Sequence, residues 1–185
     1  ADVRPVRGLD PAMGLVAVTG SAALDSDGAT DPAGWGAVRQ SARRALAHEL
    51  CGLAGRLLDD AARHVTDRHQ FGRPIAAFQT VRHRLTEVYV AVAAARAALD
   101  AAWRGADPVL ADAAKVLSGR AAALAGRHCL QVTGAIGFTE DHRLPGALRR
   151  AGVLDALYGS ADEVRAELGR SLLERRTVPR LVSLV

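Results

Sequence analysis

A short segment near residue 70 carries the side chains best suited to bind a ligand. Residues 68–75 read Arg-His-Gln-Phe-Gly-Arg-Pro-Ile, and Phe78 and Gln79 follow after two alanines. A guanidinium, an amide and an aromatic ring on a Gly/Pro turn form a combination that can bind a phosphate and pack a flat ring. An ordinary turn with a surface arginine accounts for the same residues, so this segment alone does not identify a function.

A second segment, residues 131–138, reads Gln-Val-Thr-Gly-Ala-Ile-Gly-Phe. Gly134 and Gly137 allow backbone N–H groups to approach a ligand closely, and Gln131 offers both a donor and an acceptor. The same Gly-x-x-Gly spacing is common where a helix simply ends. This segment is therefore a candidate binding loop that also fails to identify a function by itself.

The sequence lacks the patterns of metal-binding, nucleic-acid-binding and membrane proteins. There is no Cys-x-x-Cys, no His-Glu-x-x-His and no Glu-x-x-His pair, and the six histidines share no ligand spacing. The net charge of +4 comes from arginines spread among Asp and Glu, and three Phe, two Trp and two Tyr are too few for base stacking. No run of 18 uncharged apolar residues offers a membrane span. We expect no metal site, no nucleic-acid partner and no membrane insertion.

The cysteine content favours a reducing compartment. Cys51 and Cys129 are too few for a disulfide framework, and the sequence does not open with a charged and then apolar leader. We therefore expect a cytoplasmic protein.

The first 34 residues differ in pattern from the rest. Residues 1–19 are extended by composition, and the apolar run at 15–18 suits a short buried strand. Residues 20–34 are rich in Gly, Asp, Ser and Ala and form a predicted linker. A single strand does not offset its own ordering entropy, so we expect it to pair outside the sequence or to lie against the helices.

Helical periodicity dominates from Asp31 onward, which predicts an all-α fold, an antiparallel four-helix bundle with a short β remnant at the N-terminus. The expected helices run from Asp31 to about Thr66, from about Phe78 to Trp103 with a stop at Gly105, from the cap at Asp107 to near Gly134, around 147–157, and from the capping box of Ser160 and Glu163 to about Arg176. The first helix would be on the order of 45 to 50 Å long. Part of its apolar face is therefore expected to pack on another chain or domain.

Together and in this order, these segments resemble the C-terminal helical domain of the acyl-CoA dehydrogenase family. The resemblance is carried by residues 68–75, Phe78-Gln79, Ala114-Lys115, residues 131–137 and the helix with Arg149 that leads to Tyr158-Gly159. It covers about residues 35–177. It implies two parts, a β-strand remnant and linker at 1–34 and a helical bundle at 35–185.

The resemblance implies FAD as cofactor and an acyl-CoA thioester as substrate. The family residues that contact FAD across a subunit interface would correspond to Arg68, Gln70, Phe71, Gln79, Gln131, Gly134 and Gly137. Ala135 stands where the family usually has a glycine, a difference of one methyl group.

The sequence departs from the family at the catalytic base. Family members remove the substrate α-proton with a glutamate in a Tyr-Glu-Gly-Thr-x-Gln stretch, while a hydride leaves the β-carbon for the flavin. Counting from Arg149 places Tyr158 at the glutamate and Asp162 at the later glutamine. Phenols have a reference pKa near 10 against about 4.3 for glutamate, so under about one part in a thousand of a phenol is ionised at neutral pH. Where other members place the base on the first long helix, counting back from Arg68 leads to a position close to Ala42, where this chain has no glutamate.

Three explanations remain open at this stage. In the first, the chain is one subunit of a heteromeric acyl-CoA dehydrogenase for steroid or other bulky acyl-CoA esters; it supplies FAD contacts, and a homologous chain carries the base. In the second, it is a non-catalytic scaffold subunit that has lost flavin. In the third, a homo-oligomeric or stand-alone enzyme uses Tyr158 as the base. The retained residues Arg68, Gln70, Gln79 and Gln131 favour the first explanation.

Overall fold

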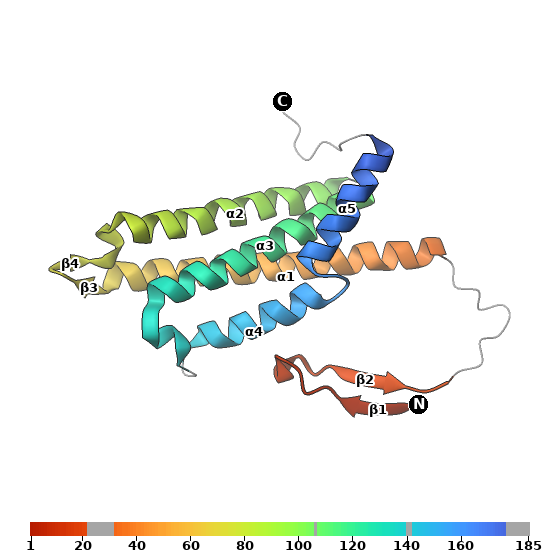
Figure 1. Ribbon diagram of the computed structural model, residues 1–185, viewed down its shortest axis with the longest axis horizontal. Coiled ribbons are helices and arrows are strands. Elements are labelled where there is room, and N and C mark those ends of the chain that lie inside the picture. The colour runs from red at the N-terminus through yellow and green to blue at the C-terminus, as the bar shows by residue number, and fades with distance from the viewer. Residues whose placement is uncertain (22–31, 106, 140–141, 177–185) are drawn as a thin grey trace.

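Three long helices form the body of the molecule (Figure 1). The computed structural model describes residues 1–21, 32–105, 107–139 and 142–176. The helices are α1 (Pro32–Asp67), α2 (Gln79–Arg104), α3 (Pro108–Thr133), α4 (Arg143–Ala156) and α5 (Ala161–Arg175). Helices α1 to α3 lie along the long axis, α4 packs against α1 and α3, and α5 packs on α3. The predicted helical bundle is confirmed.

Local capping explains where most helices begin. The Asp107 side chain accepts a hydrogen bond from the Val109 N–H at 3.0 Å, and Pro108 follows in the first turn of α3. At α5, Ser160 and Glu163 form the capping box that the sequence predicts. The predicted cap at Asp31 and most of the predicted linker lie outside the described residues.

Helix α4 begins earlier than the sequence analysis predicts. It begins at Arg143 rather than near Ala147, because the His142 imidazole caps it by accepting the Leu144 N–H at 3.1 Å. Histidine is not among the preferred N-cap residues, so no capping pattern predicted a helix start at this position. A salt bridge between Arg150 of α4 and Glu49 of α1 ties this helix to the bundle.

Small side chains line the contact between α1 and α3. Ala47 and Ala54 of α1 and Ala114, Ala121 and Ala125 of α3 are fully buried. Alanine lets helix axes approach closely, so backbone atoms and methyl groups fill the interface at the packing density of a protein interior. Larger apolar residues complete the core on either side, among them Leu50, Leu57, Val88, Val92, Leu99 and Leu154.

The N-terminal segment forms a two-stranded antiparallel ribbon. Strand β1 (Asp2–Pro5) pairs with β2 (Val16–Thr19), with Val3 opposite Val18. The predicted strand is present, but it is not buried, since Val16 and Val18 are 53% and 63% exposed. It pairs with a strand of the same chain, and Met13 of the connecting turn packs against the core of the bundle.

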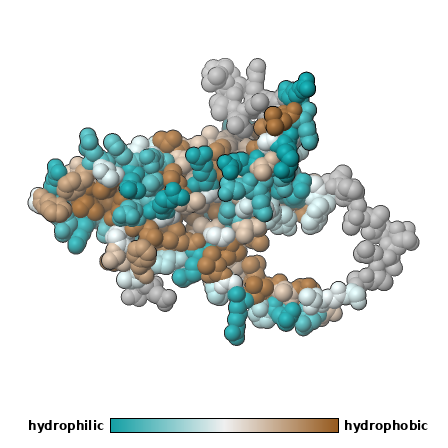
Figure 2. Space-filling model, in the orientation of Figure 1, coloured by the Kyte–Doolittle hydropathy of each residue, from teal (hydrophilic) through white to brown (hydrophobic). Residues whose placement is uncertain are grey.

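The surface of the bundle is mixed in polarity. Figure 2 shows hydrophilic residues over much of α2 and α5, and hydrophobic residues along the side of the bundle next to α4 and the ribbon. None of the helices in the part of the chain that the structure describes is both apolar enough and long enough to cross a membrane.

The burial of the two cysteines yields a simple test of the core. Burial raises the pKa of the Cys51 thiol, and burial, with the nearby Asp60 carboxylate, raises the pKa of Cys129 to about 12. At pH 8 a thiol with a pKa of about 12 is ionised to about one part in ten thousand, and the thiolate is the reactive form. We expect both thiols of the folded chain to resist Ellman's reagent and to react fully after unfolding in guanidinium. Rapid labelling of the folded chain would contradict this packing.

Candidate functional site

The first candidate segment forms a tight hairpin between α1 and α2. Its strands are β3 (His69–Gln70) and β4 (Arg73–Pro74), followed by a 3-10 turn, η2 (Ile75–Ala77). The Arg68 carbonyl accepts a hydrogen bond from the Ile75 N–H at 2.8 Å, which closes the hairpin. Phe71 and Gly72 at its tip have φ values of 54° and 76°. A left-handed phenylalanine is uncommon, so a bulky side chain is held at this tip against its backbone preference.

Aromatic contacts support the tip from one side. The Phe78 ring packs edge-on against Phe71 with centroids 6.2 Å apart, and the Arg73 guanidinium lies 4.3 Å from the Phe78 ring centre. The Phe71 side chain is nevertheless 90% exposed. A large apolar ring projects from an ordered tip into solvent.

The start of α2 adds a favourable site for an anion. Gln79 is its first residue, its N-cap Phe78 makes no side-chain capping bond, and no acidic residue lies in its first turn. The leading N–H groups therefore retain the positive end of the helix dipole. Arg68 and Arg73 add two positive charges close by in sequence. Together, these groups could bind a phosphate or pyrophosphate.

The second candidate segment ends α3 and continues as the 3-10 turn η3 (Gly134–Phe138). Gly134 has a φ of 70° and ψ of −151°, a conformation that only glycine adopts readily. Gly137 is buried, and an added Cβ would lie 3.2 Å from side-chain atoms of Leu130 and Thr133, a tight contact that would make these side chains shift slightly. Gln131 is exposed, and Ile136 and Phe138 are 54% and 69% exposed.

The two segments lie at the same end of the bundle (Figure 1). Helices α1 and α3 both run antiparallel to α2, so they are parallel to each other and their C-terminal turns emerge together. The side chains of Arg68, Gln70, Gln79 and Gln131 make no hydrogen bond or ion pair with other described residues and are exposed. They are available to a ligand or to a second molecule.

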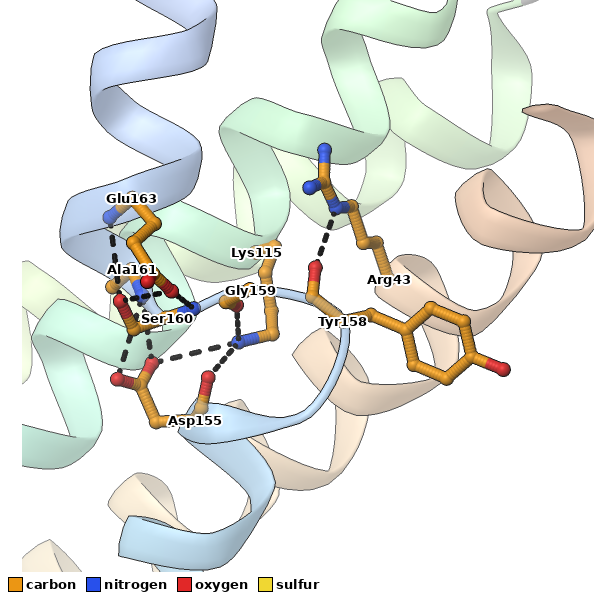
Figure 3. A network of polar contacts seen from close by, with 8 residues as sticks. All are labelled: Arg43, Lys115, Asp155, Tyr158, Gly159, Ser160, Ala161 and Glu163. Carbon is orange, nitrogen blue, oxygen red and sulfur yellow. Dashed lines mark hydrogen bonds and ion pairs between the residues drawn. The ribbon is translucent and has the colours of Figure 1, made fainter.

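Tyr158 lies elsewhere, in the turn between α4 and α5, away from the end that carries both segments (Figure 1). Tyr158 and Gly159 have φ values of 57° and 96°. The Tyr158 carbonyl accepts a hydrogen bond from Arg43 Nε at 3.0 Å, and the Gly159 carbonyl accepts one from Lys115 Nζ at 3.0 Å. Figure 3 shows the Tyr158 ring pointing away from this network.

Two buried, positively charged side chains from two different helices therefore donate hydrogen bonds to the backbone carbonyls of this turn. Arg43 of α1 is 2% exposed and also pairs with Asp112 and Glu167, each at 2.9 Å. Burial opposes its charge, but hydrogen bonds and attraction from these two carboxylates outweigh burial and raise the pKa of Arg43.

Lys115 of α3 is fully buried and donates to the Asp155 carbonyl at 2.8 Å. Burial lowers the pKa of Lys115, an effect that the Asp155 carboxylate at 3.5 Å partly offsets. Its ammonium group thus caps the C-terminal end of α4 and the turn after it.

The carboxylates near this turn are all engaged. Asp155 also accepts the Ala161 N–H at 3.2 Å, and the Glu163 carboxylate accepts the Ser160 N–H at 2.9 Å. Asp162, at the position of the family glutamine, is exposed and pairs with Arg165 at 3.0 Å. Neither Tyr158 nor Ala42, the two residues predicted at the positions of the family's base, carries a carboxylate.

No group of three or more His, Cys, Asp or Glu in the described ranges is arranged to hold a metal ion. The buried histidine, His128, is satisfied within the core: Nδ1 lies 3.1 Å from Arg84 and Nε2 lies 2.9 Å from Glu87.

Arg43 was not predicted from the sequence to belong to a site, and Lys115 was predicted only as part of a motif. A signal was present, because Arg43 lies on the stripe that continues through Ala47, Leu50 and Ala54, all fully buried. A cation on an apolar stripe needs buried partners. That requirement could have pointed to a polar network near the start of α1.

Comparisons with known proteins find a domain family and several relatives. A profile described as Acyl-CoA dehydrogenase, C-terminal domain, matches residues 34–173. The chain is 34% identical over 129 residues to acyl-CoA dehydrogenase IpdE2 of Mycobacterium tuberculosis, which covers 70% of this chain and 41% of IpdE2. It is 35% identical over 131 residues to acyl-CoA dehydrogenase FadE34 of the same organism, which covers 67% of this chain and 18% of FadE34. The chain spans less than half the length of these relatives.

Solved structures have a similar fold. The ChsE4-ChsE5 complex from Mycobacterium tuberculosis matches with a TM-score of 0.71 and 29% identity, covering 82% of this chain and 41% of that chain. A variant of the Tcur3481-Tcur3483 steroid ACAD matches with a TM-score of 0.75 and 27% identity, covering 78% and 42%. A glutaryl-coenzyme A dehydrogenase with glutaryl-CoA matches in fold with a TM-score of 0.81 at 23% identity, covering 97% and 49%.

The capping box beside the Tyr158 turn predicts a pH effect. Hydrogen bonds from the Ser160 backbone and hydroxyl lower the pKa of Glu163 below its ordinary value of 4.5. A lowered folded-state pKa stabilises the fold above pH 4.5, and this contribution is lost as pH falls through the folded-state pKa. We expect urea unfolding to show wild type more stable than Glu163→Gln at pH 7, with the difference vanishing in strong acid.

Glutamine can keep the reciprocal hydrogen bonds but carries no charge, so this comparison isolates the ionised form. Glu174→Gln, on the same helix, serves as the control and should show no such pH-dependent difference. A difference for Glu163→Gln that is the same at both pH values would contradict the assignment.

Proposed function

Because this chain belongs to the acyl-CoA dehydrogenase family and contains its C-terminal domain, we propose that it is a subunit of a heteromeric, flavin-dependent acyl-CoA dehydrogenase. In this proposal the chain contributes contacts to FAD, and a homologous partner chain supplies the catalytic base. The observation that carries the proposal is the contrast between two regions of the chain, the hairpin end of the bundle and the α4–α5 turn. At the hairpin end, the side chains of Arg68, Gln70, Gln79 and Gln131 make no hydrogen bond or ion pair with other described residues. At the α4–α5 turn, position 158 has no carboxylate and the acids around it are engaged.

The residues at the hairpin end fit the chemistry of a dinucleotide. Arg68 and the uncapped start of α2 suit a pyrophosphate, and Phe71 offers an exposed flat ring. Gln70, Gln79 and Gln131 offer amide donors and acceptors to polar edges. Gly134 gives its loop the conformation in which backbone can approach a ligand closely. When bound, FAD would supply the acceptor for the substrate hydride.

A partner chain is supported by exposed apolar side chains at this same end. Phe71, Ile136 and Phe138 are 90%, 54% and 69% exposed. Large apolar residues clustered at one end are typical of a protein interface. The ChsE4-ChsE5 structure is described as a complex of two named chains, which favours a homologous partner here as well.

We propose a bulky acyl-CoA thioester, of the steroid type, as the substrate. The support is similarity to the structure described as a steroid ACAD, at 27% identity. The match covers 42% of that chain.

The presence of flavin tests the function. The chain should be copurified with its natural partner chain and the complex examined for the visible absorption of flavin. We expect a yellow complex with about one flavin for each pair of chains. A colourless complex would contradict the proposal and favour the scaffold alternative.

Arg68 should be needed for FAD affinity. Replacing Arg68 by alanine removes one charge-assisted contact, worth about 1.5–3 kcal/mol, or roughly 10- to 150-fold in the FAD dissociation constant. Equilibrium dialysis of the purified complex would measure this change. Arg104→Ala, at the opposite end of α2, is the matched control and should leave FAD affinity unchanged. Equal losses in both variants would contradict a specific role for Arg68.

Phe71 should matter for assembly rather than for folding. Asparagine tolerates positive φ better than phenylalanine, so Phe71→Asn should not destabilise the free chain. It should weaken association with the partner chain by about 2 kcal/mol, or roughly thirtyfold in the dissociation constant, because the substitution removes an aromatic ring that the partner would bury. Titration calorimetry with the partner chain would measure this. Leu173→Asn, at a side chain 79% exposed on α5, is the control, and an equal loss there would contradict the assigned interface.

A further inference from the structure

We propose that a pocket near the start of α1 binds a short aliphatic dicarboxylate, which Arg44 and Arg39 hold by its two charges. The pocket lies between the beginning of α1, the end of α2 and the beginning of α3, at the opposite end of the bundle from the hairpin (Figure 1). Its lining contains neither Tyr158 nor any of the residues that the resemblance assigns to FAD. Binding at this pocket is therefore independent of the proposed function, and each can fail without the other.

The pocket is large enough for a small molecule. Its volume is about 510 Å³, and ligand sites usually measure about 300–1,000 Å³. Gln40 and Arg44 are four residues apart, so they lie on the same side of α1. The facing walls are small and apolar and include Ala102, Pro108 and Ala111. Among the described residues no aromatic ring lines the pocket, so a short aliphatic ligand fits it better than a flat ring.

The pocket contains positive charge that no carboxylate of the described residues neutralises. Arg44 donates to a backbone carbonyl at the end of α2 at 3.3 Å and to Ser41 Oγ at 3.4 Å, and both acceptors are neutral. Arg39 is exposed and forms no ion pair within the described ranges. Asp107 also lines the pocket, but it caps α3 and pairs with Arg175 at 3.3 Å. Two unpaired guanidinium groups at one pocket favour a ligand with two carboxylates, whose geometry matches the planar fork of arginine.

Two buried polar atoms at this pocket lack partners. Arg44 Nε and Gln40 Oε1 have no hydrogen-bond partner in the part of the chain that the structure describes. A buried donor or acceptor without a partner costs free energy, so a bound molecule that satisfies it is favoured. Turning the Gln40 amide about its last side-chain bond would exchange the oxygen for an N–H group. Gln40 and Arg44 could then both donate to one carboxylate of the ligand.

Trp103 lies next to Arg44 and can report on binding. The Arg44 guanidinium lies 4.9 Å from the centre of the Trp103 ring, which is stacked beneath it on the side of α2. An anion bound to Arg44 would change the electric field at this ring. The chain has two tryptophans, Trp35 and Trp103, so its indole N–H groups give two resonances that are easily separated.

Heteronuclear NMR of the full chain, titrated with succinate, tests the pocket. Trp103→Phe would assign the Trp103 indole resonance, and sodium chloride would keep the ionic strength constant because salt screens exposed charges. We expect the Trp103 resonance to shift and to reach saturation. In Arg44→Met the succinate dissociation constant should rise at least about tenfold, because a charge-assisted contact is lost. A wild-type chain without a saturable shift would overturn the proposal.

Arg82→Met is the matched control. It removes the same charge as Arg44→Met, but from an exposed position on α2 at the hairpin end, outside the lining of the pocket. The succinate dissociation constant should stay unchanged in this variant. An equal rise in Arg82→Met and Arg44→Met would overturn the proposal, because binding would then follow the net charge of the chain alone.

Two other anions test the class of ligand. Butyrate has the length of succinate but only one carboxylate, so it should bind about threefold more weakly, and Arg39→Met should reduce succinate binding by a similar factor. Inorganic phosphate is not planar and should bind more weakly than succinate. Equal affinity for butyrate and succinate, or tighter binding of phosphate, would overturn the assignment of a dicarboxylate.

Discussion

The close packing of α1 on α3 is the constraint on which both functional regions depend. Fully buried alanines such as Ala47 and Ala121 bring the two helices together. Because these helices are parallel, their final turns emerge at one end of the bundle, so the hairpin and η3 lie at the same end (Figure 1). The same packing places Arg43, near the start of α1, and Lys115, near the start of α3, within reach of one turn. A shift of one helix along the other would separate both sets of residues at once.

The two regions are built in opposite ways. At the hairpin end, the side chains of Arg68, Gln70 and Gln79 are exposed and make no hydrogen bond or ion pair within the described part of the chain. The backbone there is held by a short hairpin and by the ring contact between Phe71 and Phe78. At the α4–α5 turn, the charged groups are buried and almost fully paired. Free polar groups can bind another molecule, whereas a saturated network can only hold geometry. This difference is the basis on which we propose ligand recognition for the first region and structural support for the second.

Local sequence signals predicted the elements better than they predicted the contacts between them. Asp107 with Pro108, and Ser160 with Glu163, gave helix starts because a cap acts through hydrogen bonds to residues a few positions away. The start of α4 was missed because an imidazole caps it. Arg43 was missed because an arginine in a helix is usually solvated, and its three acceptors are 69 to 124 residues away in sequence. The segments with Phe71 and Gln131 were candidates from their residue types alone. A function for them was inferred only through the family resemblance, since an exposed turn has the same local pattern with or without a ligand.

The β1–β2 ribbon affects how the chain behaves in solution. Val3, Pro5, Val16 and Val18 share one face, because directly paired residues point to the same side of the ribbon, and all four are exposed. Asp2, Arg4 and Thr19 occupy the other face, and an ion pair links Asp2 with Arg4. With only two strands, each strand also leaves one row of backbone groups unpaired. An exposed apolar face next to unpaired strand edges favours association between copies of the chain. A high protein concentration would therefore promote aggregation through the β1–β2 ribbon, none of whose strand residues is buried in the core.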